Sequence, residues 1–170
     1  MSHKVTYHPL HADDAQAVSS LHAHVFGPGR FARTAYRVRE QRGGGCVQVS
    51  PFCQAAELGN RLIASVTMTP IRIGTVGDCL LLGPLAVHPE FAGLGYGRGL
   101  VAAAIEAARI AGIKAIILVG DESYYARFGF NRVAPGHITF PGPVDQGRIL
   151  GLELEEGALA AARGLVVAEG

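Results

Sequence analysis

Glycines alternate with other residues over positions 93–99, in the run GLGYGRG. The run follows an almost wholly apolar segment, residues 79–87, and precedes an amphipathic segment, residues 98–111. The start of a helix has unpaired backbone amides and a partial positive charge. Glycine lets such a backbone approach a phosphate closely. The spacing therefore predicts an anion-binding loop between a buried strand and a helix.

Two well-known phosphate loops do not fit this run. The dinucleotide fingerprint needs a glycine three residues after its second glycine, and here that position is Arg98 or Leu100. The mononucleotide P-loop needs Gly-Lys-Ser/Thr, which the chain lacks. On the run alone, a glycine-rich turn without a ligand remains an alternative.

The segment after the glycines has the period of a helix. Its apolar side chains fall on one face, while Glu106 and Arg109 point away and Gly112 ends the pattern. Residues 115–119 then form a short apolar run that predicts a buried strand. Strand, helix and strand in this order predict a parallel crossover unit. The expected buried face consists of Leu100, Val101, Ala104, Ile105 and Ala108.

The rest of the chain predicts an antiparallel meander and further helices. Alternating residue types over residues 62–73 predict a strand with one exposed face. The expected fold class is α+β, with a mixed, mostly antiparallel sheet, helices on both faces and one domain over residues 1–170. We expect strands at Val5–Pro9, 47–56, 62–73, 79–87, 136–141 and 148–154, and helices at 12–25, 31–41 and, capped by Asp121, 122–128.

Composition excludes several classes. The net charge of +1 and the absence of a polybasic run speak against nucleic acid as a partner. No apolar stretch approaches the roughly 20 residues that span a bilayer, and the N-terminus lacks a signal peptide's apolar core, so we expect a cytoplasmic protein without a membrane segment. The three cysteines and seven histidines show no metal-ligand spacing, so no metal is expected. Cys46, beside three glycines, is interpreted as an ordinary loop or strand residue.

Three blocks together resemble the GNAT superfamily of N-acetyltransferases. They are Leu85-x-Val87-x-Pro89, then Gly93-x-Gly95-x-Gly97, and later Tyr125-x-x-x-Gly129–Phe130. The segments 82–89, 120–130, 26–40 and 149–159 resemble the YhbS-like branch of that superfamily, so the resemblance covers most of the chain. The chain departs from the family at Ala92, where relatives have Gln or Arg, and at Gly120–Asp121, where many have Asn.

This resemblance implies an acetyl-coenzyme A site. It assigns the backbone amide of Leu85 to the acetyl carbonyl and Val87 to the pantetheine, with a strand bulge at Gly83–Pro84. It makes Tyr125 the general acid that protonates the leaving thiolate, although Tyr125 could also be one member of an aromatic core cluster. The implied cofactor-binding residues are Leu85, Ala86, Val87, Gly93, Leu94, Gly95, Tyr96, Gly97, Arg98, Asp121, Tyr124 and Phe128.

The acceptor and the base stay open. Glu57, His22, His24 and Asp121 could each deprotonate an amine, and no spacing selects one of them, whereas His88 before Pro89 is interpreted as a turn residue. The arginines of the second helix could border an acidic acceptor, although a solvated helix face is the simpler interpretation. They are Arg30, Arg33, Arg37, Arg39 and Arg42.

The expected activity is acetyl transfer from acetyl-coenzyme A to a primary amine of a small molecule or peptide. The alternatives are a sensor that binds acyl-coenzyme A without turnover and an acyltransferase for longer chains. A homodimer is left open.

Overall fold

The computed structural model describes residues 4–29, 33–40 and 49–169. A twisted, mixed sheet runs through the molecule in the order β1-β2-β3-β4-β5-β8-β6, and β9 pairs with both β3 and β7. Most neighbours are antiparallel; β4–β5 and β7–β9 are parallel. The strands are β1 (Val5–Pro9), β2 (Gln54–Leu58), β3 (Arg61–Ile73), β4 (Val76–Val87), β5 (Ala115–Val119), β6 (Asn131–Arg132), β7 (Ile138–Thr139), β8 (Ile149–Glu153) and β9 (Gly164–Ala168).

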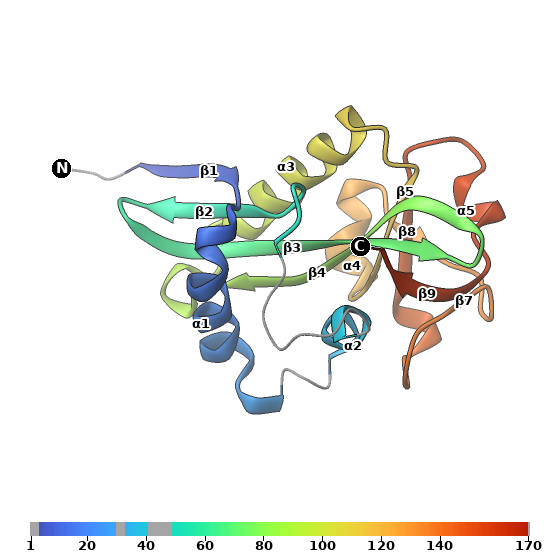
Figure 1. The fold of residues 1–170 in the computed structure, drawn as a ribbon. Helices are drawn as coiled ribbons and strands as arrows, with labels where there is room; N and C mark the ends of the chain where they lie inside the picture. Colours follow the sequence, from blue (N-terminus) through green and yellow to red (C-terminus); the bar gives the residue numbers. More distant parts are fainter. Residues whose placement is uncertain (1–3, 30–32, 41–48, 170) are drawn as a thin grey trace.

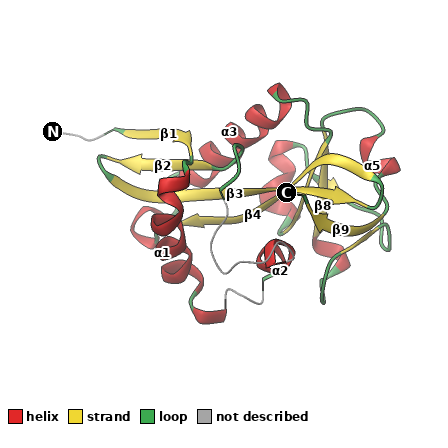
Figure 2. Cartoon of the chain, viewed as in Figure 1, coloured by secondary structure: helices red, strands yellow, loops and turns green. Residues whose placement is uncertain are grey.

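Helices cover both faces of this sheet. In Figures 1 and 2, α1 and α2 lie in front of the sheet and α3 lies behind it. The predicted α+β class with helices on both faces is therefore confirmed. The helices are α1 (Ala15–Phe26), α2 (Thr34–Glu40), α3 (Tyr96–Ile110), α4 (Glu122–Tyr125) and α5 (Ala158–Ala161).

The unit β4–α3–β5 is the predicted parallel crossover. Cys79, Leu80 and Leu81 pair with residues 115–117 of β5 in parallel register. The predicted apolar face of α3 is buried as expected, and Arg109 and Glu106 lie exposed on the other side. The burial of this face, at about 25 cal/mol per Å² of apolar surface, fixes the start of α3 against the sheet.

The predicted exposed face of β3 is wrong. Residues 63–69 are all buried, because α3 covers one face of the strand and α1 packs on the other. Ser65, Thr67 and Thr69 therefore lie in the interior. Among the described residues, neither Ser65 Oγ nor Thr67 Oγ1 has a hydrogen-bond partner. The alternation of residue types separated the two faces of this strand correctly, but the more polar face is not exposed to solvent.

Several predicted boundaries shift. The strand expected at residues 47–56 begins only at Gln54, because a turn precedes it in which the Cys53 amide donates to the Ser50 carbonyl. The helix expected at 12–25 opens with a 3-10 turn, Ala12–Asp14, and ends at Phe26. The segment 122–128 divides into α4 and a 3-10 turn, Ala126–Phe128.

The other strand predictions hold in position and differ in length. β4 begins at Val76 rather than residue 79, and the two late strands are shorter than predicted, as β7 and β8. The helix expected from residue 98 begins at Tyr96, as α3. The short elements β6, β9 and α5 were not predicted at all. None of the described helices is long and apolar enough to cross a membrane.

Some predictions fall outside the described residues. They concern Arg30, Arg42, Cys46, Gly43–Gly45, the first residues of the expected strand at 47–56 and both ends of the expected helix at 31–41. The side chain of Arg39 is also outside the described part.

Thr67→Val should stabilise the protein. The buried hydroxyl loses its hydration on folding and gains no protein partner, so its removal at nearly constant shape should raise the free energy of unfolding by about 1 kcal/mol. Urea denaturation measures the change. Ser50→Ala is the contrast: Ser50 Oγ donates to the Met68 carbonyl, so its loss should cost about 1 kcal/mol. A destabilised Thr67→Val would mean that the hydroxyl has a solvent partner.

Candidate functional site

Strand β4 is broken at the position that the sequence predicted. Val66 pairs with Leu85 and Met68 pairs with Leu82, so the single residue Thr67 lies opposite both Gly83 and Pro84. Two residues against one define a β-bulge, which turns the strand and frees backbone groups from the ladder. Gly83 has a φ of 130°, which a side chain would disfavour.

The strands β4 and β5 also diverge at this point. Their pairing ends at Leu81 and Ile117, although β4 continues to Val87 and β5 to Val119. β5 keeps its pairing with β8 up to Val119, so it is β4 that departs from its neighbour. The result is an opening in the sheet beside residues 83–87, where the β4 backbone groups that point away from β3 pair with no strand.

The glycine loop lies at the end of β4 and opens α3. Gly93 and Gly95 have φ values of 76° and 88°, and Gly95 is the N-cap of the helix. A methyl group added at either glycine would meet no protein atom within 4 Å. The backbone at the start of this 15-residue helix is thus bare on its outer side, with Arg98 exposed in the first turn. This arrangement suits an anionic group.

The other two glycines of the loop are packed against tyrosines. A methyl group on Gly97 would lie 3.1 Å from the Tyr124 hydroxyl oxygen and close to the Val87 and Leu85 side chains. One on Gly99 would lie 2.5 Å from the hydroxyl oxygen of Tyr7. Gly97 therefore joins α3, the end of β4 and the tyrosine segment at one place.

Tyr125 is the last residue of α4, and its ring lies against the backbone just after β5. Its ring is so close to Gly120 that a methyl group there would be 2.8 Å from Tyr125 Cε2. The ring makes edge contacts with Tyr124 at 4.8 Å and Phe130 at 5.8 Å between centroids. Burial raises the pKa of Tyr125 to about 12, with smaller contributions in the same direction from Tyr124 and Asp121. Its phenol therefore keeps its proton throughout the neutral range.

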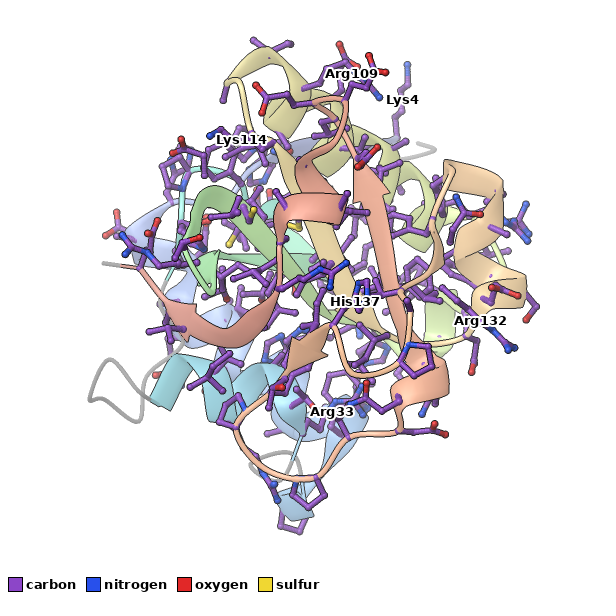
Figure 3. The ribbon with its side chains drawn as sticks, turned by 90° about the vertical axis from the view of Figure 1, so that its right-hand side faces the viewer. Lys4, Arg33, Arg109, Lys114, Arg132 and His137 are labelled. Atoms are coloured by element: carbon purple, nitrogen blue, oxygen red, sulfur yellow. The ribbon has the colours of Figure 1, made fainter. Side chains whose placement is uncertain are left out.

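A cavity of about 270 Å³ borders the β4 break at Gly83 and Pro84. Its apolar wall comes from β4 and the end of β5, and its polar residues are Arg33, Thr34 and Arg148. Figure 3 shows Arg33 beside α2. The lining residues are Arg33, Thr34, Ala35, Leu81, Leu82, Gly83, Pro84, Val119 and Arg148.

Asp121 does not cap α4 with its side chain, contrary to the prediction. The residue occupies the N-cap position in extended conformation, but no cap hydrogen bond forms. Its carboxylate instead accepts a hydrogen bond from Arg148 Nη2 at 3.2 Å. Asp121 thereby ties the end of β5 to the turn before β8.

The other candidate bases are dispersed. Glu57 pairs with His8 at 3.2 Å, and His22 lies on the buried face of α1. His24 stacks on His88 at 4.8 Å between ring centroids. His88 accepts a hydrogen bond from the Glu90 amide, which confirms its predicted turn role.

Within the described part of the chain, no three His, Cys, Asp or Glu side chains are placed to hold a metal ion. Cys53 and Cys79 are buried and free.

The sequence did not single out Tyr7, Thr67 or Arg148 as residues of this region. Tyr7 comes from the first strand and reaches α3, more than 90 residues further along the chain. The packing of Tyr7 on Gly99 could be known only from the tertiary structure. Arg148 precedes a late strand in an ordinary turn, and its partner Asp121 is distant in sequence.

A broken strand, a diverging parallel neighbour and a glycine-rich helix start are the features of an N-acyltransferase. The chain belongs to the acetyltransferase (GNAT) family, whose family model matches residues 16–130. It is therefore an acyltransferase, and the resemblance that its motifs indicated is confirmed.

Two relatives from Escherichia coli support this placement. The chain is 27% identical over 144 residues to the protein named "Uncharacterized N-acetyltransferase YjhQ" of strain K12, covering 83% of this chain and 77% of YjhQ. It is 28% identical over 107 residues to "Uncharacterized N-acetyltransferase YhbS" of the same strain, covering 62% of this chain and 64% of YhbS.

Solved structures share the fold. The Escherichia coli YhbS structure in complex with CoA superposes with a TM-score of 0.79 at 22% identity, covering 99% of this chain and 92% of YhbS. A GNAT acetyltransferase of Brucella melitensis in complex with acetyl-CoA gives a TM-score of 0.63 at 24% identity, covering 86% and 95% of the two chains.

The raised pKa of Tyr125 should appear in a phenolate titration. In the folded protein, one of the five tyrosines should ionise near pH 12, and Tyr125→Phe should remove that step. A phenol whose pKa is higher in the folded state stabilises the fold below pH 10 and loses this contribution between about pH 10 and 12. Absorbance of the phenolate measures the titration. If Tyr124→Phe, and not Tyr125→Phe, removed the late step, the assignment would be wrong.

Proposed function

We propose that this chain transfers the acetyl group of acetyl-coenzyme A to a primary amine by direct attack, with Tyr125 as general acid. The carrying observation is the break of β4 at Gly83–Pro84, where β5 diverges. The glycine loop lies beyond one end of the opening, and the cavity with Arg33 adjoins the other. A donor and an acceptor could thus meet at one backbone segment.

The loop residues fit the pyrophosphate of the coenzyme. Gly93 and Gly95 leave open space in front of the start of α3, and the amides of that first turn have no partner within the helix. Arg98 adds a positive charge that can replace the side chain absent at Ala92. Leu94 and Tyr96 contribute backbone amides to the same cradle.

The pantetheine would run along the opened edge of β4. In this proposal Leu85 donates its amide to the acetyl oxygen, while Ala86 and Val87 border the pantetheine. The Tyr124 hydroxyl approaches Gly97 at the same place as the Leu85 and Val87 side chains, so in this proposal it borders the same path. Phe128 packs against both tyrosines, with ring centroids 6.2 and 6.5 Å away. Asp121 does not cap α4; its carboxylate binds Arg148 and contributes to the raised pKa of Tyr125.

The leaving sulfur needs a proton, and Tyr125 holds one. An ordinary alkyl thiol has a pKa of about 8.5 and Tyr125 has a pKa of about 12, so proton transfer from the phenol to a free thiolate is unfavourable and must be coupled to proton loss from the attacking nitrogen. The amine loses one proton on acylation and the sulfur gains one. Tyr125 can therefore donate as the carbon–sulfur bond breaks and regain a proton from the attacking nitrogen.

A thiol-release assay tests the activity. Acetyl-coenzyme A is offered with amines, amino acids, polyamines, aminoglycosides and peptides, and turnover with any of them supports transfer. Hydrolysis without acceptor and no turnover with any amine would contradict it. The expected single domain over residues 1–170 and the cytoplasmic location belong to the same proposal, and cell fractionation tests the location. A homodimer stays open, and gel filtration tests it.

Acetyl-coenzyme A should bind to the wild type and not to Gly95→Val. Ligand at about 100 times its dissociation constant adds about 2.7 kcal/mol of stability, whereas NAD and ATP should add much less. A valine at residue 95 would project into the open space in front of the loop and abolish this shift. Melting scans with and without ligand measure it.

Gly157→Val is the matched control. Gly157 is also a helix N-cap, with a φ of 82° and open space around it, so the substitution imposes similar backbone strain far from the loop. It should lower stability comparably and keep the ligand-induced shift. Equal ligand shifts in the two variants would mean that the loop does not hold the coenzyme.

Tyr125→Phe should separate binding from chemistry. Loss of a general acid typically lowers the rate about 10²- to 10⁴-fold, while affinity for acetyl-coenzyme A should hardly change. Tyr124→Phe should do the reverse, because its hydroxyl lies on the pantetheine path: weaker affinity with a nearly normal chemical step. Single-turnover rates at saturating coenzyme measure both. A Tyr125→Phe variant that retains more than about a third of the wild-type single-turnover rate would exclude the general-acid role.

A further inference from the structure

The cavity beside the β4 break has an asymmetric lining. Leu81, Leu82, Pro84 and Val119 make an apolar wall next to the segment that would hold the acetyl group. The charged residues of the lining are both arginines, Arg33 and Arg148, and no carboxylate is among the lining residues. A ligand here would meet apolar surface near the reacting carbon and guanidinium groups elsewhere.

Arg148 is held in place by one partner. Its Nη2 donates to Asp121 Oδ1 at 3.2 Å, and the Arg148 side chain is 50% exposed. A guanidinium carries five N–H donors, so this bond leaves most of them available. The ion pair fixes the guanidinium at the cavity and uses only part of its hydrogen-bonding capacity.

Arg33 is held without a counter-charge. Its guanidinium carbon lies 4.2 Å from the centroid of the Phe26 ring, a cation–π contact that orients the group. Among the described residues, no carboxylate forms an ion pair with Arg33. Because Asp121 offsets Arg148, the cavity keeps a surplus of about one positive charge from Arg33. The labelled cations Lys4, Arg109 and Lys114 lie toward the opposite end of the molecule (Figure 3).

Arg33 also lies within electrostatic reach of the proposed acid. Its positive charge acts on the pKa of Tyr125 in the direction opposite to burial. Val119 of the cavity lining directly precedes Gly120, on which the Tyr125 ring packs, so the cavity and the phenol both lie at the end of β5. This places the cavity at the reacting end of the site rather than at the nucleotide end.

The cavity is small. Its volume of about 270 Å³ is just below the usual range of about 300–1,000 Å³ for small-molecule sites. It suits a compact aliphatic acceptor. A polyamine or an aminoglycoside carries several positive charges and would meet the uncompensated Arg33.

We infer that the acceptor is a small primary amine that bears an anionic group, a carboxylate or a phosphate, which Arg33 and Arg148 bind. The inference rests on the proposed transferase function and specifies its substrate class. The neutral amine nitrogen attacks the thioester carbonyl carbon, a carbon–nitrogen bond forms and the carbon–sulfur bond breaks. The nitrogen loses one proton and the sulfur gains one, so the products are the N-acetylated anion and free coenzyme A.

Matched pairs of amines test the charge requirement. β-Alanine is compared with β-alaninamide, and phosphoethanolamine with ethanolamine, with putrescine as the cationic probe. Thiol release at saturating acetyl-coenzyme A gives kcat/KM for each. The charged member of at least one pair should exceed its neutral partner at least tenfold, since a charge-assisted hydrogen bond is typically worth such a factor. The pair that responds tells carboxylate from phosphate.

Variants locate the effect. Arg33→Gln and Arg148→Gln should each lower the ratio of charged to neutral amine about tenfold, mainly through KM, without changing the affinity for acetyl-coenzyme A. Arg72→Gln is the matched control, because Arg72 forms an exposed ion pair with Glu169 far from the cavity. Melting temperatures of the three variants are measured alongside.

The outcomes separate the two proposals. Two results would overturn the anionic acceptor and leave the transferase function standing. One is turnover that prefers neutral amines or putrescine. The other is a kcat/KM ratio of charged to neutral amine that is unchanged in both cavity variants. If no amine is turned over, the transferase proposal fails and the cavity is tested by calorimetry with N-acetyl-β-alanine and N-acetyl-β-alaninamide on protein saturated with coenzyme A. Tighter binding of the carboxylate, lost in Arg33→Gln, supports the anion site, and equal or absent binding overturns it.

Discussion

The break in the pairing of β3 and β4 is the constraint on which the rest of the site depends. Thr67 faces two residues, Gly83 and Pro84, and the same segment leaves its parallel neighbour β5. A regular β4 would have closed the sheet and satisfied its own backbone groups in ladders. Because it does not, polar backbone groups are presented within a largely apolar core. The flanking helices then only need to position the binding groups on either side of that opening.

The glycine run serves two physical requirements at once. Gly93 and Gly95 adopt left-handed backbone conformations next to open space, which a turn and a close ligand approach both need. Gly97 and Gly99 have ordinary helical conformations and are small because Tyr124 and Tyr7 pack on them. The first two glycines of the run therefore leave the start of α3 open, and the last two allow α3 to pack closely against its neighbours. Sequence alone could not divide the run in this way.

The sequence predicted the parts that depend on local periodicity. The period of α3, the short apolar run of β5 and the Gly-Pro break in β4 are each visible within a few residues. The elements that it missed depend on distant partners: β9 gains its pairing from β3, almost a hundred residues away, and β6 has only two residues. Burial of Ser65 and Thr67 likewise requires knowing that helices pack on both faces of β3. Asp121 illustrates the same limit, since its partner Arg148 displaces the local cap.

Arg33 couples the two sides of the opening through charge. It counteracts the burial that raises the pKa of Tyr125, so the phenol is most acidic when nothing offsets the guanidinium. An anionic acceptor bound at Arg33 would offset that influence and make the phenol a weaker acid, so proton delivery would depend still more on the proton that the attacking nitrogen releases. In the proposed reaction, Arg33 would therefore bind the charge of the acceptor and influence the acid only through its field.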